Sequence, residues 1–246
     1  MTSEDEQIHS FAAQQISPPY QIMRQNWLTG KPNSLSAFLA LFCTLTVVLI
    51  SQLYWSNLFS AQDWMPATRE LVFQKMQYWR AWTTLFVHGD SKHLLSNSFF
   101  FFIFGLLVHG YFGVIAFPLA AFVMGGLINL VVLSNMPLET QLIGASGVVF
   151  WLGGFWLILS FLIDRRRGIM HRLLKTIGIS LVLFFPSEAF NPAISYKAHL
   201  VGFVFGLMAG LATYLAFKKV LKSKDRIETI IDIDPGFNPE TEEQIT

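Results

Sequence analysis

The 246-residue chain is 53% apolar and only 13% charged, and its mean hydropathy is +0.47. These values exclude an ordinary soluble globular domain, because the apolar residues lie in long uncharged blocks and are not scattered at helix or strand spacing. A formal net charge of +1 gives no overall field that would attract nucleic acid. The one cysteine, Cys43, excludes intrachain disulfides and paired-cysteine metal or redox motifs.

The N-terminal residues 1–34 are polar and begin with a cluster of acidic side chains. They lack the charged n-region and cleavage site of a signal peptide, and the arginine-rich character of a transit peptide. We therefore expect an N-terminal tail that lies outside the membrane and is retained in the mature protein.

Long uncharged runs follow this tail, and a membrane-spanning helix needs about 20 largely apolar residues. The sequence predicts six spans: Ser36–Trp55, two within residues 93–138 that fold back at 109–113, one within 140–163, one within 173–190 and one within 198–217. The fifth span includes two charged residues, Lys175 and Glu188, and each must extend its side chain from one end of the span to the membrane surface.

The segment between the first and second spans, residues 56–92, is long and carries Trp64, Trp79 and Trp82 among charged residues. Tryptophan is enriched at the membrane interface. We therefore predict a long outer loop with short amphipathic helices that lie in the headgroup layer.

Basic residues set the topology. The densest basic loop is residues 164–175, and four lysines follow the last span within residues 218–224. The positive-inside rule places both in the cytoplasm, which requires the fifth span between them. Arg24 and Lys31 place the N-terminus there as well. The prediction is an all-α protein of the cell (inner) membrane, with a cytoplasmic N-terminal tail (1–34), a six-span domain (35–217) and a cytoplasmic acidic tail (218–246), of which residues 225–246 are expected to be mobile.

Four polar side chains at the outer ends of three spans stand out, because polar groups at membrane depth are costly. His93 and Asn97 open the second span, four residues apart and hence on one helix face. Ser146 opens the fourth span and His199 opens the sixth. Since these three spans run in the same direction, all four side chains are expected at one level near the outer surface.

This group has a chemical interpretation. A serine hydroxyl, an imidazole that removes its proton and two neutral donors for an oxyanion form a hydrolytic site. Glycines on the spans of Ser146 and His199 would allow the close helix approach that such a site needs: Gly144, Gly147, Gly202, Gly206 and Gly210. No acidic residue lies in the outer halves of these spans to orient the imidazole, so we expect a Ser-His dyad where soluble enzymes use a triad. We expect no metal and no cofactor.

Each feature also has an ordinary explanation. A serine in a membrane helix usually bonds a carbonyl of the preceding turn, glycine stripes usually serve helix packing, and a histidine near a helix end is often an interfacial anchor. Their occurrence together at one level favours a site. His109, His171 and His9 are expected to be solvated, and His88 in the outer loop is a candidate to support His93 by hydrogen bonding.

At these residues the sequence resembles the rhomboid family of intramembrane serine proteases over roughly residues 36–217. The motifs that carry the resemblance occur in family order: the Trp79-Arg80 pair, His-x-x-x-Asn at His93 and Asn97, Gly-x-Ser-Gly at Gly144 to Gly147, and Ala-His-x-x-Gly-x-x-x-Gly at Ala198 to Gly206. The resemblance implies Ser146 as nucleophile and His199 as general base and then acid. It further implies an oxyanion hole from His93, Asn97 and the Ser146 backbone N–H, and an outer loop braced by Trp79 and Arg80.

Two positions depart from the family pattern. Phe150 stands where the family often has a tyrosine packed on the catalytic imidazole, so the stacking should survive without the hydroxyl. Near the end of the second span, Gly105 and Gly113 bracket His109 where the family often has an acidic residue. The short six-span form without added domains is typical of bacterial members.

The predicted substrates are transmembrane proteins, and the other partners are membrane lipids. A substrate helix must unwind near the scissile bond, because its own hydrogen bonds shield the peptide groups. We expect a movable cap near residues 187–197 and lateral access between the second and fifth spans. The alternatives are a catalytically inactive relative that binds membrane helices, and a small-solute transporter, which would carry polar residues at several depths.

Overall fold

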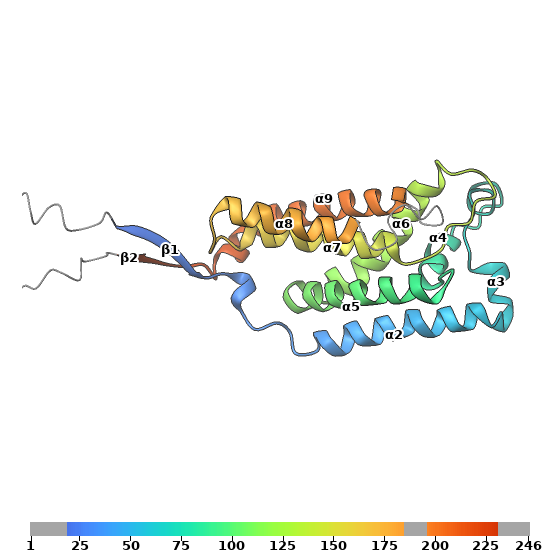
Figure 1. Cartoon of the computed structure of the whole chain (residues 1–246), viewed down its shortest axis with the longest axis horizontal. Coiled ribbons are helices and arrows are strands. Elements are labelled where there is room, and N and C mark those ends of the chain that lie inside the picture. The colour runs from blue at the N-terminus through green and yellow to red at the C-terminus, as the bar shows by residue number, and fades with distance from the viewer. Residues whose placement is uncertain (1–18, 185–195, 231–246) are drawn as a thin grey trace, which may run out of the picture.

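The computed structural model describes residues 19–184 and 196–230, and most of these residues are helical. Figure 1 shows the long helices side by side along one axis, with two strands projecting from one end and short helices at the other. The described elements in chain order are β1 (Tyr20–Gln25), η1 (Trp27–Thr29), α2 (Ser36–Trp55), η2 (Leu58–Ser60), α3 (Ala61–Trp64), η3 (Glu70–Gln74), α4 (Arg80–Thr83), η4 (Thr84–Phe86), α5 (Ser91–Val114), η5 (Ile115–Ala120), α6 (Ala121–Leu133), α7 (Ser146–Ile163), α8 (Ile169–Phe184), α9 (Tyr196–Lys222) and β2 (Arg226–Ile230).

Among the described residues, four helical stretches are long and apolar enough to cross a membrane: α2, the stretch Ser91–Leu133, α7 and α9. The chain is therefore a multi-pass membrane protein. Helix α2 has the predicted bounds, Ser36–Trp55. Helix α7 lies at the centre of the bundle, since 72% of its apolar window is buried, against 28% for α2 and 17% for α9. Its side chains Trp151, Leu152 and Leu157 are almost completely buried in the core.

The stretch Ser91–Leu133 doubles back on itself, but not where the sequence predicted. Helix α5 continues through residues 109–112, and the chain leaves helical geometry at Gly113, which has φ +78°. The reversal follows in η5, where the Phe117 ring packs on Gly105 of α5. Gly110 does not form a turn. It allows close contact with Pro32, whose side chain lies 3.0 Å from where a Cβ would stand.

The two histidines predicted at the inner ends of spans, His109 and His171, differ in their exposure to solvent. His109 is buried, with 5% of its surface exposed, so the expectation that it is solvated was wrong. The helix passes through this residue, so its ring lies inside the bundle and not in a turn. His171 is exposed, as expected, and His9 lies outside the described residues.

Helix α8 begins at Ile169, four residues before the predicted fifth span, and its described part ends at Phe184. The remainder of the predicted span and most of the predicted cap, residues 185–195, lie outside the described residues.

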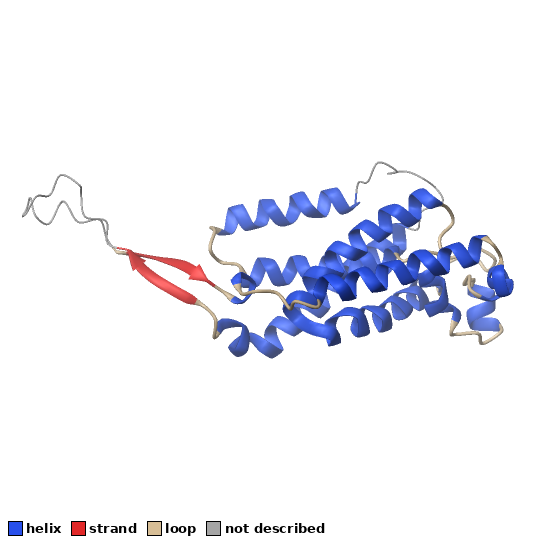
Figure 2. Ribbon diagram, turned by 90° about the horizontal axis from the view of Figure 1, so that it is seen from below, coloured by secondary structure: helices blue, strands red, loops and turns tan. Residues whose placement is uncertain are grey.

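The two strands were not predicted, so the all-α expectation and the mobile C-terminal tail need correction. Strands β1 and β2 pair antiparallel, from Tyr20 opposite Ile230 to Gln25 opposite Arg226, as Figure 2 shows in red. Arg24 and Glu228 form an ion pair across the sheet at 2.5 Å. Each strand alone is short and polar, so neither carries an apolar period that marks a strand in sequence. The strands form only because the folded chain brings residues 20–25 and 226–230 together, and no local sequence pattern shows this.

Candidate active site

Helices α7 and α9 touch through their backbones near one end. A Cβ at Gly202 would lie 2.2 Å from the carbonyl oxygen of Gly147, and a Cβ at Gly206 would lie 2.2 Å from that of Trp151. Real Cβ atoms do not approach so closely, so only glycine fits either position. The predicted glycine stripe therefore brings the two helices into direct contact.

This contact brings the first turns of α7 and α9 together. Ser146 is the first residue of α7 and precedes Gly147, while His199 lies one turn before Gly202. Both side chains are buried, with 7% and 6% of their surfaces exposed. The serine and the imidazole, 53 residues apart in sequence by their numbers, thus lie at the same helix–helix junction.

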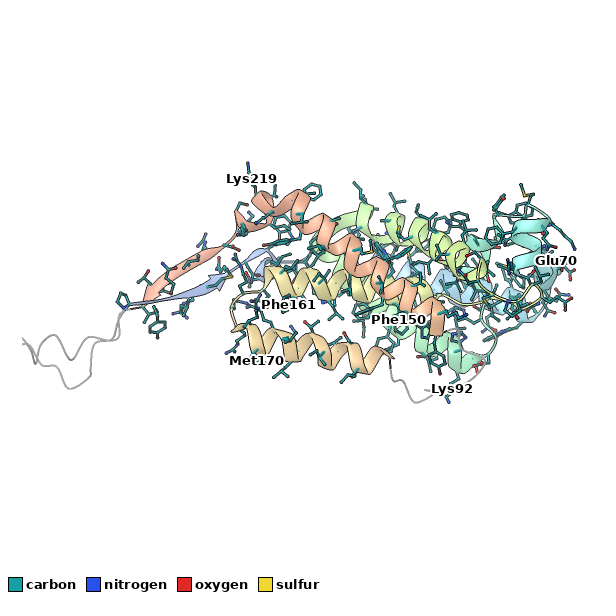
Figure 3. All side chains as sticks on the ribbon, turned by 90° about the horizontal axis from the view of Figure 1, so that it is seen from above. Glu70, Lys92, Phe150, Phe161, Met170 and Lys219 are labelled. Carbon is teal, nitrogen blue, oxygen red and sulfur yellow. The ribbon has the colours of Figure 1, made fainter. Side chains whose placement is uncertain are left out.

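The His199 ring is held by aromatic contacts. The Phe150 ring stacks on the imidazole with 4.1 Å between ring centroids and 12° between planes, and the Tyr196 ring meets it edge-on at 5.9 Å. Phe150 lies one turn after Ser146 on α7, and Figure 3 shows it on the helix beside α9. The stacking expected for Phe150 is therefore present, and it fixes the plane of the imidazole beside the first turn of α7.

His93 and Asn97 lie against the loop that leads into Ser146. Gly144 has φ +111°, a conformation that favours glycine, and a Cβ there would lie 3.0 Å from His93 Cε1 and 3.8 Å from Asn97 Nδ2. The structure therefore brings all four predicted residues, from α5, α7 and α9, to one region. The glycine two residues before Ser146 makes the approach of the α5 side chains possible.

Two buried polar atoms in this region, Asn97 Nδ2 and His199 Nε2, have no hydrogen-bond partner within residues 19–184 and 196–230. Buried polar groups are almost always paired, so exceptions call for an explanation. A donor from α5 and a ring nitrogen from α9, both beside the first turn of α7, match the parts of a site that acts on a polar substrate group. The first N–H groups of α7 add donors, because a helix start leaves them without an intrahelical acceptor.

His88 supports the loop before Ser146, in a different way from the one predicted. Its fully buried ring accepts a hydrogen bond from the Ala145 backbone N–H at Nε2 (3.3 Å), and its Nδ1 pairs with the Ser51 hydroxyl at 3.1 Å. Ser51 donates to the Phe86 carbonyl, so Nδ1 carries the proton. Both ring nitrogens are thus used, and the contact with His93 is edge-to-face at 5.2 Å and not a hydrogen bond.

Burial is the main cause that lowers the pKa of His88 to about 3. The neighbouring His93 lowers it further, and Asp90 opposes the shift. The ring is therefore neutral at physiological pH, which it must be for Nε2 to accept from Ala145.

Arg80 braces the outer loop. Its buried guanidinium donates to the carbonyls of Pro66 and Asp63, both at 3.0 Å, and to the Gln77 side chain at 2.5 Å. Burial lowers the pKa of Arg80. Trp79 contributes less to the packing, because 52% of its surface is exposed.

Two further residues that the sequence analysis missed connect the outer loop to the site. Thr84 is fully buried: its hydroxyl donates to the Leu142 carbonyl, and its own carbonyl accepts from the Gly144 N–H at 3.0 Å. Asn129 of α6 donates to the Ala81 carbonyl at 2.8 Å. Asn129 is a buried amide in an otherwise apolar run, a signal that could have singled it out. Thr84 carries no such signal, because its role depends on backbone contacts.

No group of three or more metal-ligating side chains that could hold an ion occurs in the part of the chain that the structure describes. The polar groups of the site are a hydroxyl, imidazoles, an amide and backbone N–H groups. They can transfer protons and stabilise an oxyanion, which is the chemistry of acyl transfer.

The sequence also matches a known family model and known proteins. The family model described as the rhomboid domain matches residues 75–216. The chain is 30% identical over 145 residues to YdcA of Bacillus subtilis (strain 168), which carries the name of a rhomboid protease; the match covers 58% of this chain and 69% of that protein. It is 29% identical over 149 residues to the rhomboid protease GlpG of Haemophilus influenzae (strain ATCC 51907 / DSM 11121 / KW20 / Rd), covering 59% of this chain and 73% of that one.

Proposed function

Because this chain belongs to the rhomboid family, we propose that it is an intramembrane serine endopeptidase with a catalytic dyad of Ser146 and His199. The observation that carries the proposal is the contact of Gly202 with the Gly147 carbonyl, which joins the first turns of α7 and α9. The stacking of Phe150 on His199 supports it, because it holds the imidazole beside the helix that Ser146 begins.

The proposed reaction proceeds through an acyl-enzyme. His199 removes the proton of the Ser146 hydroxyl as the oxygen attacks the carbonyl carbon of the scissile peptide bond. His199 then gives this proton to the leaving amide nitrogen. In the second half, His199 takes a proton from water, the hydroxide attacks the ester carbon, and the proton returns to the Ser146 oxygen.

The proposed oxyanion hole consists of His93, Asn97 and the backbone N–H of Ser146. Support comes from the position of the first two against Gly144 and of the third at the start of α7, where the helix dipole favours negative charge. Trp79 and Arg80 would act at a distance from the site by holding the outer loop. The glycines would act by permitting close approach: Gly147, Gly202 and Gly206 of α7 to α9, and Gly144 of the loop to the side chains of α5.

The proposed topology has six spans in a domain of residues 35–217, in the cell (inner) membrane, with both termini cytoplasmic. The reversal at η5 supports two spans within Ser91–Leu133, and α8 supplies 16 described residues of a further one. Strands β1 and β2 support an even number, because their pairing puts both terminal segments on one side. The basic residues at this end, such as Arg165 and Lys219, favour the cytoplasm.

The proposed substrates are transmembrane proteins, whose helices must unwind to expose a peptide bond to Ser146. Lateral access between α5 and α8, with a cap formed by residues 187–197, remains part of this proposal. Cross-linking α5 to α8 tests it: cleavage should stop, and a cross-linked protein that cleaves normally would contradict lateral access there.

The decisive experiment combines covalent labelling and cleavage. A fluorophosphonate should label the purified protein, and both labelling and cleavage of a transmembrane reporter substrate should be lost in Ser146→Ala. His199→Ala should lower cleavage by a factor on the order of 10⁴. Ser180→Ala, in α8, is the matched control and should keep full activity. An inactive helix-binding relative would instead bind the reporter, fail to cleave it and resist the label.

A further inference from the structure

A polar cavity of about 670 Å³ lies at the end of the molecule opposite the outer loop. Its lining residues come from three segments: residues 25–27 and 29–31 around η1, residues 110–111 near the end of α5, and residues 223, 224 and 226 at the junction of α9 and β2. Figure 3 shows Lys219 of α9 at this end, near the strands, and Glu70 of the outer loop at the other. The cavity residue Asn26 donates to Asp164, which directly follows the last residue of α7, whereas Ser146 is the first residue of that helix. The cavity therefore lies at the opposite end of α7 from Ser146 and is not part of the proposed catalytic site.

The charge of this cavity is uniformly positive. Lys31, Lys224 and Arg226 line it, and no acidic side chain does. None of the three forms an ion pair with an acid among the described residues, although other cations nearby do. Three unneutralised cations around one cavity make a site that favours a dianionic or monoanionic ligand.

Two carboxylates that adjoin the residues of the cavity already form ion pairs with arginines outside it. Asp225 pairs with Arg165 at 2.5 Å, and Asp164 pairs with Arg166 at 2.7 Å and accepts from Asn26 at 2.9 Å. The hydrogen bond from Arg166, assisted by that from Asn26, lowers the pKa of Asp164 to about 2. Both carboxylates are bound to their own partners, and they do not neutralise the cations that line the cavity.

The walls of the cavity are held in place. The Trp27 indole donates to the Tyr111 carbonyl at 3.0 Å, and the Asn33 N–H donates to the Gly110 carbonyl at 2.8 Å, so η1 is fixed to the end of α5. Asn26 is buried and caps η1. The pairing of Gln25 with Arg226 closes the third side. A site with its walls formed in advance loses less entropy on binding.

The position at a helix end indicates the source of the anion. Trp27 and Tyr111 are aromatic side chains of the kind that lie at headgroup level. The last turns of α9, which lead to the cavity, expose the apolar side chains Leu215, Phe217 and Val220. These side chains can contact the acyl chains of a bound lipid. The cytoplasmic leaflet is the one that carries anionic lipid and attracts lysine and arginine near the membrane.

We propose that this cavity binds the phosphate-bearing headgroup of an anionic phospholipid in the cytoplasmic leaflet, and that Lys31, Lys224 and Arg226 contact the phosphate. This site rests on the proposed topology and not on catalysis. Its ligand would join both terminal segments to the membrane, because its cations come from either end of the chain.

The test measures how strongly spin-labelled phosphatidylglycerol associates with the full-length protein in bilayers, relative to spin-labelled phosphatidylcholine. The cavity variant is Lys31→Gln, Lys224→Gln and Arg226→Gln. Its matched control, Lys218→Gln, Lys219→Gln and Lys222→Gln, removes the same charge from the same end of the molecule outside the cavity. The preference for phosphatidylglycerol should fall at least about tenfold in the cavity variant and much less in the control.

A charge-conserving variant, Lys31→Arg, Lys224→Arg and Arg226→Lys, should keep the preference, which guards against a folding defect of the glutamine variant. Ser146→Ala should also keep it, so the result is independent of proteolysis. Equal losses in the cavity and control variants would overturn the site and leave a diffuse surface charge.

A second arm separates lipid from soluble phosphate. Phosphatidylglycerol should raise the thermal unfolding midpoint of the wild type in phosphatidylcholine bilayers, whereas millimolar inorganic phosphate should not. An equal rise with inorganic phosphate would overturn the lipid assignment.

Discussion

The imidazole of His88 accepts a hydrogen bond at 3.3 Å from the backbone N–H of Ala145, the residue immediately before Ser146. His88→Phe keeps a ring of similar shape but leaves that N–H without its partner. Since small displacements of a nucleophile are costly, kcat should fall roughly ten- to hundredfold with little change in KM. Steady-state cleavage of a transmembrane reporter measures this. Ser51→Ala removes the Nδ1 partner and the hydrogen bond to the Phe86 carbonyl but leaves the bond to Ala145, so it should have a smaller effect. An unchanged kcat in His88→Phe would show that the loop holds its position without His88.

The burial of His88 also makes stability depend on pH. Its pKa is about 3 in the folded protein, below the ordinary value of 6.5. Below pH 6.5 the unfolded chain binds a proton at this residue that the folded protein does not, so the free energy of unfolding decreases as the pH falls from 6.5 towards 3. The slope that His88 contributes is at most about 1.4 kcal/mol per pH unit.

His88→Gln should remove this contribution and flatten the pH dependence of the unfolding midpoint between pH 6.5 and 4. The measurement is thermal unfolding in detergent, followed by circular dichroism. Identical slopes for the variant and the wild type would contradict a neutral, buried His88.

Gly202 and Gly178 provide a matched pair of glycines. A Cβ at Gly202 would overlap the Gly147 carbonyl, whereas a Cβ at Gly178 of α8 would meet no described atom within 4 Å. Gly202→Ala should therefore separate α7 from α9, with a cost of about 1–3 kcal/mol in stability and loss of most activity. Gly178→Ala should leave activity intact and raise stability, since alanine favours helix by up to about 1 kcal/mol. Equal activities of the two variants would contradict the role of the helix contact.

Arg80 and Arg69 form a second matched pair, both in the outer loop. Arg80 is buried and reaches three acceptors, whereas Arg69 is exposed and donates to the Met136 carbonyl at 3.3 Å. A lysine has a single charged point and cannot reproduce the planar guanidinium. Arg80→Lys should lower stability by about 1–3 kcal/mol, measured by thermal unfolding, and Arg69→Lys should leave it nearly unchanged. Similar midpoints for the two variants would count against Arg80 as the brace of this loop.

The sequence predicted those features that rest on local patterns. The bounds of α2, the start of α7 at Ser146 and the glycine contacts follow from apolar runs and from the four-residue spacing of Gly202, Gly206 and Gly210. Helix periodicity and small side chains are local signals, so they can be recognised without a structure.

The features that escaped prediction join segments far apart in the chain. Thr84 and Leu142 meet through a hydrogen bond from a hydroxyl to a backbone carbonyl, and Ala67 pairs with Leu142 as an isolated bridge. Any residue carries a backbone carbonyl, so no residue type marks such contacts. The same holds for β1 and β2, and for Gly110, which looked like a turn because its packing against Pro32 is invisible in sequence.

The pairing of β1 with β2 has a consequence for biosynthesis. Arg24 and Glu228, which meet across the strands, are separated by 204 positions. Strand β1 leaves the ribosome first and has no partner until translation has produced every helix between them. The sheet can therefore form only after every membrane helix has been synthesised. Its formation brings the two ends of the chain together, which costs the conformational entropy of closing one long loop.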